Sequence, residues 1–146
     1  MEKASKKIQV FSAGGVAYGV PAEHVLTIAE WRQPASLPHA PEAVLGVVSI
    51  HGRMLTVIDL SKLAETNHGD GDPTHILALR GDEQLALAIN ERGEVVEYGE
   101  GENARETNRG LVSDVIKRNG TDITILDIKE LFPTVIQGRE RRRRRF

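Results

Sequence analysis

The sequence predicts a mainly β protein built from two small barrel-like subdomains that share one core. One observation is an internal repeat: HGRMLTVIDLSKL at 51–63 and NGTDITILDIKEL at 119–131 align their Gly, Thr and Asp residues as well as their apolar positions. Another is that short apolar or alternating runs, which are typical of strands, dominate the chain. Because open edges on strands this apolar would promote aggregation, we expect closed sheets.

The first copy of the repeat begins with a predicted hairpin. The run QVFSAGGVAYGV turns at Gly14 and Gly15, and the strand HVLTI follows at 24–28. The prolines of LPHAP at 37–41 favour a crossover without ladder pairing, and Gly46 releases the chain into the strand VVSI.

The first copy ends with a second hairpin and a helical turn. We expect a tight turn at Gly52 and Arg53 to join VVSI to MLTVIDL. Asp59 is then predicted to cap a short helix that starts at Ser61. Residues 64–73, AETNHGDGDP, are polar, rich in Gly and closed by a Pro, which predicts a linker.

The second copy follows the same order of elements. HILALRGDEQLALAI predicts a hairpin with its turn near 81–82, and GEVVEYG takes the place of HVLTI. The Asn-Gly pair at 119–120 is a strong signal for a two-residue hairpin turn. Asp127 and Glu130 resemble a capping box before the final apolar residues.

The domain organisation predicted from this repeat is a single domain over 1–138, with subdomain one at about 8–65 and subdomain two at about 74–135. Residues 139–146 form an Arg-rich tail that we expect to be disordered. Six Arg and one Glu give this tail a charge of +5, so the net charge of −2 leaves −7 on the rest of the chain.

The composition is that of an ordinary globular protein, with 40% hydrophobic and 27% charged residues. The absence of cysteine excludes disulfides and thiolate chemistry. No apolar run approaches the roughly 20 residues of a membrane span, and the first residues lack the apolar segment of a signal peptide. We therefore expect a cytoplasmic protein.

Catalytic or metal-ligating residues do not converge in the sequence. Asp59 and Asp127 occupy equivalent strand-to-helix junctions, which favours capping over a catalytic carboxylate pair. Asp70 and Asp72 lack the further oxygen ligands of a Ca²⁺ loop. None of the histidines has the helical spacing of a metal site: His24, His39, His51, His68 and His75. We expect no enzyme activity, cofactor, metal or small-molecule ligand.

The run LPHAPEAVLGVVSIHGRMLTVIDLSKL resembles the signature of CheW-like domains, the coupling proteins of bacterial chemotaxis. That family typically reads P-x-A-P-x-x-x-x-G-x-x-x-x-R-G-x-x-x-P-x-x-D-L. The resemblance extends from about residue 8 to about residue 132. The positions of the signature that match are Pro38, Ala40, Pro41, Gly46, Gly52, Asp59 and Leu60.

The resemblance implies two five-stranded SH3-like barrels and a non-catalytic adaptor. Such an adaptor bridges a chemoreceptor's cytoplasmic tip and the regulatory domain of a CheA-type histidine kinase. By similarity, the surface that faces the kinase would include Val25, Thr27 and Gly46, and the surface near the receptor would include His51, Gln84 and Leu85. A Gly46→Asp exchange is expected to weaken kinase binding while the protein stays folded.

Several positions depart from the family pattern. The Arg before the hairpin Gly is His51 here, with an Arg displaced to position 53, and an acidic residue common after the LALAI strand is Asn90. At position 51 the mostly neutral imidazole of histidine replaces the permanently charged guanidinium of arginine. An alternative to the coupling function is therefore an accessory family member that binds another receptor or a motility partner without kinase activation.

The Arg-rich tail lies outside the family pattern. The simplest interpretation is a disordered solubilising end, and a sharper one is weak contact with an anionic membrane. A nucleic-acid-binding barrel is a further alternative, which the charge of −7 on the body disfavours. The residues that would make either contact are Arg139, Arg141, Arg142, Arg143, Arg144 and Arg145.

Overall fold

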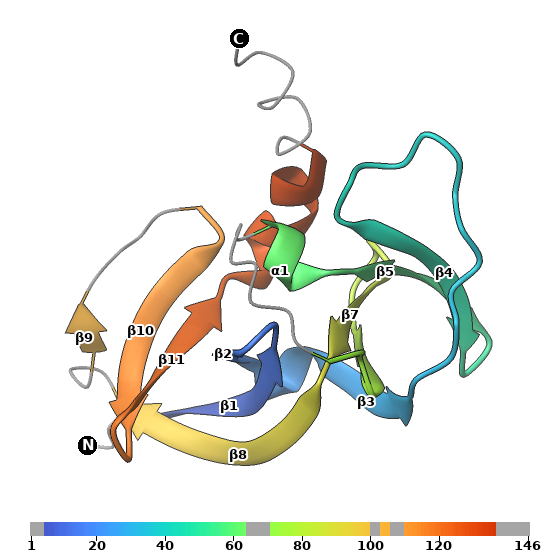
Figure 1. Ribbon diagram of the computed structural model, residues 1–146. Helices are drawn as coiled ribbons and strands as arrows, with labels where there is room; N and C mark the ends of the chain where they lie inside the picture. Colours follow the sequence, from blue (N-terminus) through green and yellow to red (C-terminus); the bar gives the residue numbers. More distant parts are fainter. Residues whose placement is uncertain (1–4, 64–70, 100–102, 106–109, 137–146) are drawn as a thin grey trace, which may run out of the picture.

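The computed structural model describes residues 5–63, 71–99, 103–105 and 110–136, which fold into two curved β-sheets (Figure 1). One sheet has six strands in the order β8 (Glu91–Gly99), β1 (Ser5–Ala13), β2 (Val16–Pro21), β11 (Thr121–Leu126), β10 (Val112–Arg118) and β9 (Asn103–Arg105). The other has five, in the order β3 (Val25–Glu30), β6 (His75–Leu79), β7 (Leu85–Ile89), β5 (Arg53–Ile58) and β4 (Val44–Ile50). The predicted mainly β class is confirmed.

The internal repeat is visible in the strand register. In the β4–β5 hairpin Val44 lies opposite Ile58, and the register then shifts so that Gly46 lies opposite Val57. The β10–β11 hairpin repeats both pairings and the same shift 68 residues later. The hydrogen bond from Asp59 N to Ala43 O, at 2.8 Å, recurs from Asp127 N to Leu111 O at the same distance. The duplication inferred from the sequence therefore extends to individual backbone bonds.

The two copies exchange hairpins, so the sheets do not follow the expected subdomains 8–65 and 74–135. The β1–β2 hairpin of the first copy pairs with β8 and β11 of the second, and the β6–β7 hairpin pairs with β3 and β5 of the first. Hairpins can be recognised from local turn residues, but the pairing between hairpins depends on packing across the whole chain. The assignment of one barrel to each contiguous half was therefore wrong.

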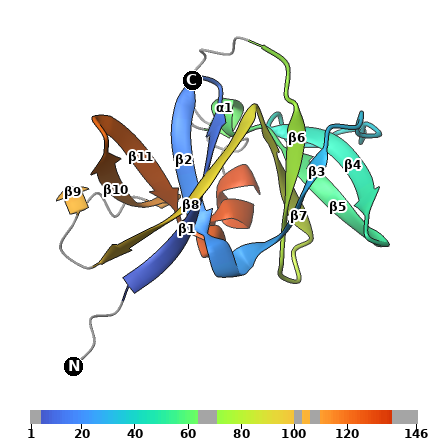
Figure 2. The same ribbon diagram turned by 90° about the horizontal axis from the view of Figure 1, so that it is seen from below.

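A strap after β3 closes the five-stranded sheet into a barrel. Ala35 and Val47 exchange two backbone hydrogen bonds, of 2.8 and 2.9 Å, which joins the strap to β4 at the opposite edge. In the second copy β9 holds the corresponding place, because Arg105 lies opposite Val115 on β10. Figure 2 shows the two groups of strands side by side. The SH3-like barrels are confirmed, although one of the two sheets has six strands where five were expected.

Three two-residue hairpin turns have both central residues at positive φ. These angles are 60° and 82° at Gly14 and Gly15, 53° and 77° at His51 and Gly52, and 52° and 79° at 119–120. They identify type I′ turns, whose twist matches that of the flanking strands. The second turn lies one residue earlier than expected, because Arg53 already pairs with Ile50.

Two aspartates cap the short helical segments that follow β5 and β11, as predicted. Asp59 Oδ1 accepts bonds from Ser61 N at 3.0 Å and Ser61 Oγ at 2.7 Å, at the start of α1 (Leu60–Leu63). Asp127 Oδ1 accepts from Lys129 N at 3.0 Å, at η2 (Ile128–Glu130). The second half of the predicted capping box was wrong, because Asp127 N already donates to Leu111 O.

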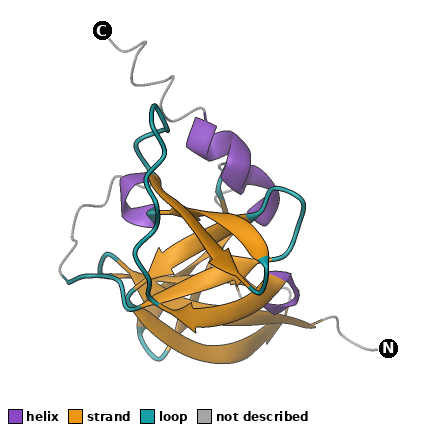
Figure 3. Cartoon of the chain, turned by 90° about the vertical axis from the view of Figure 1, so that its right-hand side faces the viewer, coloured by secondary structure: helices purple, strands orange, loops and turns teal. Residues whose placement is uncertain are grey.

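The largest buried cluster joins the two barrels. It contains Phe11 and Tyr18 from the six-stranded sheet and Leu77 and Leu87 from the five-stranded sheet. Residues 131–136 are helical and add Leu131 and Val135 to the same cluster, with their helix on the outside of the strands (Figure 3). A smaller cluster fills each barrel. The two barrels are thus held together by the burial of apolar side chains that neither barrel could bury alone.

Candidate partner-binding surfaces

The residues expected to face a kinase lie on the two edge strands of the five-stranded barrel. Val25 and Thr27 are half-buried on β3, where they lie opposite Leu79 and Ala78. Gly46 lies on β4 beside the strap, away from that pairing. The structure therefore places the three residues at the two edges of the barrel, which the strap bridges.

Gly46 is buried and closes the barrel through backbone contact. A Cβ at this position would press on the carbonyl of Ala35, at 2.8 Å from its carbon, and would lie 2.9 Å from Pro34 Cβ. Its φ of 144° is also one that residues with side chains rarely adopt. The crowding expected at Gly46 is confirmed. Because the added side chain would meet backbone atoms of the strap, we expect Gly46→Asp to destabilise the fold as well as any interface.

The residues expected to face a receptor differ in exposure. His51 and Gln84 are exposed and both have positive φ, of 53° and 57°. Leu85 is only 7% exposed and belongs to the cluster that joins the barrels. Leu85 therefore supports the surface from within.

An arginine links the two loops that carry His51 and Gln84. Arg53 Nη2 donates to the carbonyl of Gly81 at 3.1 Å, which ties the β4–β5 hairpin to the β6–β7 loop. The backbone adds a second link, from Thr56 N to Gln84 O at 2.9 Å. The hairpin and the loop therefore form one continuous surface.

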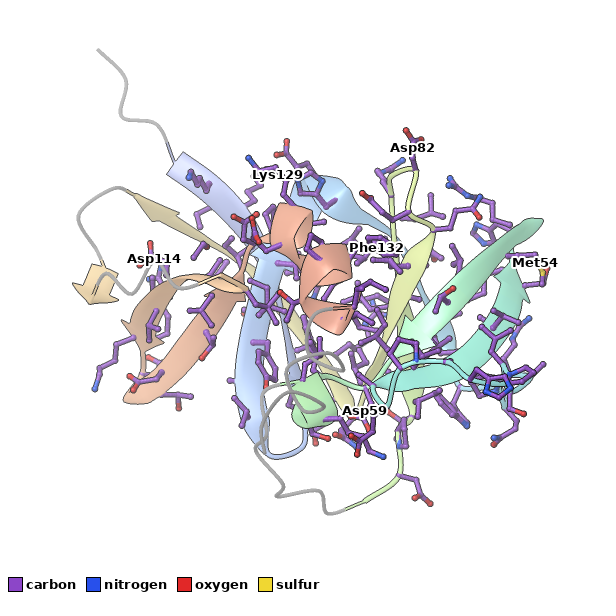
Figure 4. The ribbon with its side chains drawn as sticks, turned by 90° about the horizontal axis from the view of Figure 1, so that it is seen from above. Met54, Asp59, Asp82, Asp114, Lys129 and Phe132 are labelled. Carbon is purple, nitrogen blue, oxygen red and sulfur yellow. The ribbon has the colours of Figure 1, made fainter. Side chains whose placement is uncertain are left out.

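A pocket of about 460 Å³ lies between β1, β2 and the start of η2. Its apolar lining comes from Ile8, Pro21, Ile125, Leu126 and Ile128, and its polar lining comes from Lys6, His24, Ser113, Asp127 and Lys129. Lys129, which belongs to η2, is labelled in Figure 4. Sequence reasoning missed this pocket, because its lining residues come from strands that only the hairpin exchange brings together.

Within the described ranges, five large apolar side chains are more than two-fifths exposed. Met54, at 57%, lies at the tip of the five-stranded barrel, far from Phe132 in Figure 4. Phe132 and Ile136 are 45% and 43% exposed, and their spacing places them on one face of the last helix. Leu37 and Val95 are the other two.

The carboxylates and histidines of the described ranges form no group of three or more that could hold a metal ion. Asp59 and Asp127 use their carboxylates to cap helices, and they belong to different barrels. Among the described residues no helix is long and apolar enough to cross a membrane.

The fold and these surfaces define a two-barrel β protein. The family model for the CheW-like domain matches residues 7–135, and the chain belongs to that family. It is 25% identical over 134 residues to the chemotaxis protein CheW of Bacillus subtilis, which covers 86% of this chain and 85% of the relative. It is also 25% identical over 77 residues to a probable chemotaxis protein CheW of Rhizobium etli, which covers 53% of this chain and 50% of that protein.

The fold is also shared with a solved structure. The crystal structure of the scaffolding protein TtCheW from Thermoanaerobacter tengcongensis aligns with a TM-score of 0.73. The alignment covers 85% of this chain and 90% of that protein, at 23% sequence identity. Similarity at this level establishes the shared two-barrel architecture.

Proposed function

We propose that this chain is a non-catalytic adaptor that couples chemoreceptors to a CheA-type histidine kinase in chemotaxis. The observation that carries this proposal is the CheW-like family match over residues 7–135. Scaffolding needs separate surfaces for separate partners. The strap-bridged edges of the five-stranded barrel and the surface around His51 and Gln84 are two such places.

On the kinase side, the proposed contact lies along β3 with Val25 and Thr27 at its centre. Both residues are half-buried, so a partner could cover them without leaving a deep cavity. Gly46 contributes by keeping the strap tight against β4. Because Gly46 is buried, it would shape the proposed kinase contact through backbone packing and not through direct contact with the kinase.

On the receptor side, the proposed contact uses the linked hairpin and loop, with the pocket beside η2 as a further recess. The apolar residues that line this pocket would accept apolar side chains of a helical receptor tip. Lys6 and Lys129, which also line the pocket, would pair with acidic side chains of the receptor. Because the Arg53 bond to Gly81 joins the two loops, we expect both loops to respond together when a receptor binds.

A reconstitution with receptor membranes and kinase tests the proposal. Kinase autophosphorylation should rise in the presence of the adaptor, at fixed receptor and kinase concentration. Replacing Thr27 with a charged residue, Thr27→Glu, should lower that activation by weakening kinase binding, since an unpaired charge would be buried. No activation by wild-type protein at any concentration would contradict the coupling function.

An accessory role is the second candidate, and His51 is the observation that favours it. The left-handed φ of 53° suits the first position of a type I′ turn, which Asn119 holds in the other copy. If receptor coupling needs an arginine fork here, His51→Arg should increase receptor-dependent kinase activation. His51→Asn is the matched control, because it keeps the turn and adds no charge. Equal activation by both variants would favour the accessory role.

A further inference from the structure

Asn90 lies at the point where the chain leaves one barrel and enters the other. It is the residue between β7 of the five-stranded sheet and β8 of the six-stranded sheet. Its backbone N–H donates to Ser12 O on β1 at 2.8 Å, and its carbonyl accepts from the Thr74 hydroxyl. The main chain at Asn90 is therefore bound to β1 of the six-stranded sheet and to the residue that precedes β6 of the five-stranded sheet.

The side chain of Asn90 makes bonds in two directions. Its Oδ1 accepts from Gly14 N, in the β1–β2 turn, at 2.9 Å. Its Nδ2 donates to Asp72 O at 3.1 Å and to Gly71 O at 3.4 Å. An amide accepts through its oxygen and donates through its nitrogen, whereas an ionised carboxylate can only accept.

The β1–β2 turn is in turn packed on α1. A Cβ added at Gly14 would lie 2.9 Å from Ser61 Cβ, so turn and helix are in close contact. Ser61 belongs to the last described element before residue 64, and Gly71, inside the predicted linker 64–73, is the first residue described after Leu63. The described residues on the two sides of 64–70 therefore meet at the same turn, Ser61 directly and residues 71–72 through Asn90.

We propose that the Asn90 amide is a latch that fastens residues 71–72 to the β1–β2 turn and so joins the two barrels at one point. The hairpin exchange makes this point structurally important, because Gly14 and Asn90 belong to different copies of the repeat. An aspartate here would keep the bond from Gly14 and lose both bonds to 71–72. The amide thus adds a restraint on residues 71–72 that an ionised carboxylate could not provide.

Nuclear magnetic resonance of the full chain can resolve the two arms of the latch. Hydrogen exchange of the Gly14 amide reports the accepting arm, and the ¹⁵N heteronuclear Overhauser effects of Gly71 and Asp72 report the donating arm. In Asn90→Asp we expect unchanged Gly14 exchange and clearly lower Overhauser effects at 71–72. In Asn90→Ala we expect both changes, with Gly14 exchange faster by about fivefold, the factor for one ordinary hydrogen bond.

Asn119→Asp is the matched control, because it makes the same chemical change in a hairpin turn outside the latch. It should leave the amide exchange of Gly14 and the Overhauser effects of Gly71 and Asp72 at their wild-type values. The latch is overturned if Asn90→Asp leaves the Overhauser effects of 71–72 unchanged. It is equally overturned if Asn90→Asp and Asn90→Ala speed Gly14 exchange to the same extent.

Discussion

At the residue scale, positive backbone φ separates glycines that serve packing from glycines that serve only a turn. Gly46 and Gly52 both have such angles, of 144° and 77°. A Cβ at Gly46 would meet the strap, whereas a Cβ at Gly52 would meet nothing within 4 Å. The pair therefore isolates the energetic cost of barrel closure from the cost of the backbone angle alone.

We expect Gly46→Ala to lower the free energy of unfolding by at least about 3 kcal/mol, since backbone overlap is added to backbone strain. Gly52→Ala should cost about 1 kcal/mol, because only strain is added. Urea denaturation followed by circular dichroism measures both. Similar losses for the two variants would show that the strap yields easily and that Gly46 is not a closure point.

Also at the residue scale, the two caps differ in the number of bonds that they accept. Asp59 Oδ1 accepts two and Asp127 Oδ1 accepts one. Replacing an N-cap aspartate with alanine typically costs about 1 kcal/mol. We expect Asp59→Ala to lower the free energy of unfolding more than Asp127→Ala does. Asp59→Asn should lower it least, because the amide oxygen remains an acceptor. Thermal unfolding of the three variants gives the order, and a reversed order would mean that Ser61 contributes little.

At the element scale, each hairpin has a turn that forms locally, but its strands depend on pairing with strands of the other copy. Each has its own type I′ turn or five-residue loop, yet the strands β2 and β7 need parallel partners from the other copy. Isolated two-stranded hairpins are marginal in water, so these partners provide much of their stability.

This dependence predicts the behaviour of fragments at the element scale. A chain divided between residues 67 and 68 should yield two fragments that are largely unfolded alone, because each sheet would lose its central strands. Mixing them should restore the two-barrel fold. Circular dichroism and amide spectra of separate and mixed fragments provide the measurement. A fragment that folds cooperatively alone would contradict the importance of the exchange.

At the scale of the whole molecule, charge is divided between an acidic body and a basic tail that lies outside the described residues. Each Arg near an anionic bilayer contributes about 1 kcal/mol at best, and the body's negative charge opposes the contact. We expect weak, salt-sensitive binding to anionic vesicles that truncation after Gln137 removes. Co-sedimentation at low and near-physiological salt tests this, and equal sedimentation of the truncated protein would exclude the tail as the contact.

The sequence by itself determined the elements and their duplication. Turn pairs such as Asn119-Gly120 and capping residues such as Asp59 act within a few positions of the chain, so turns and caps can be predicted from short stretches of sequence. The alternation of apolar residues likewise identifies strands before any fold is known. Even the crowding at Gly46 could be anticipated from its place between a proline-rich crossover and a buried strand.

Only the tertiary structure decided which hairpin completes which barrel. The β1–β2 and β6–β7 hairpins are alike in pattern, and either could pair within its own copy as far as local sequence is concerned. The choice follows from burying one apolar cluster between both sheets, a long-range effect that no short stretch encodes. The pocket beside η2, the inward position of Leu85 and the bonds of Asn90 all depend on that exchange, because each joins residues from different copies of the repeat.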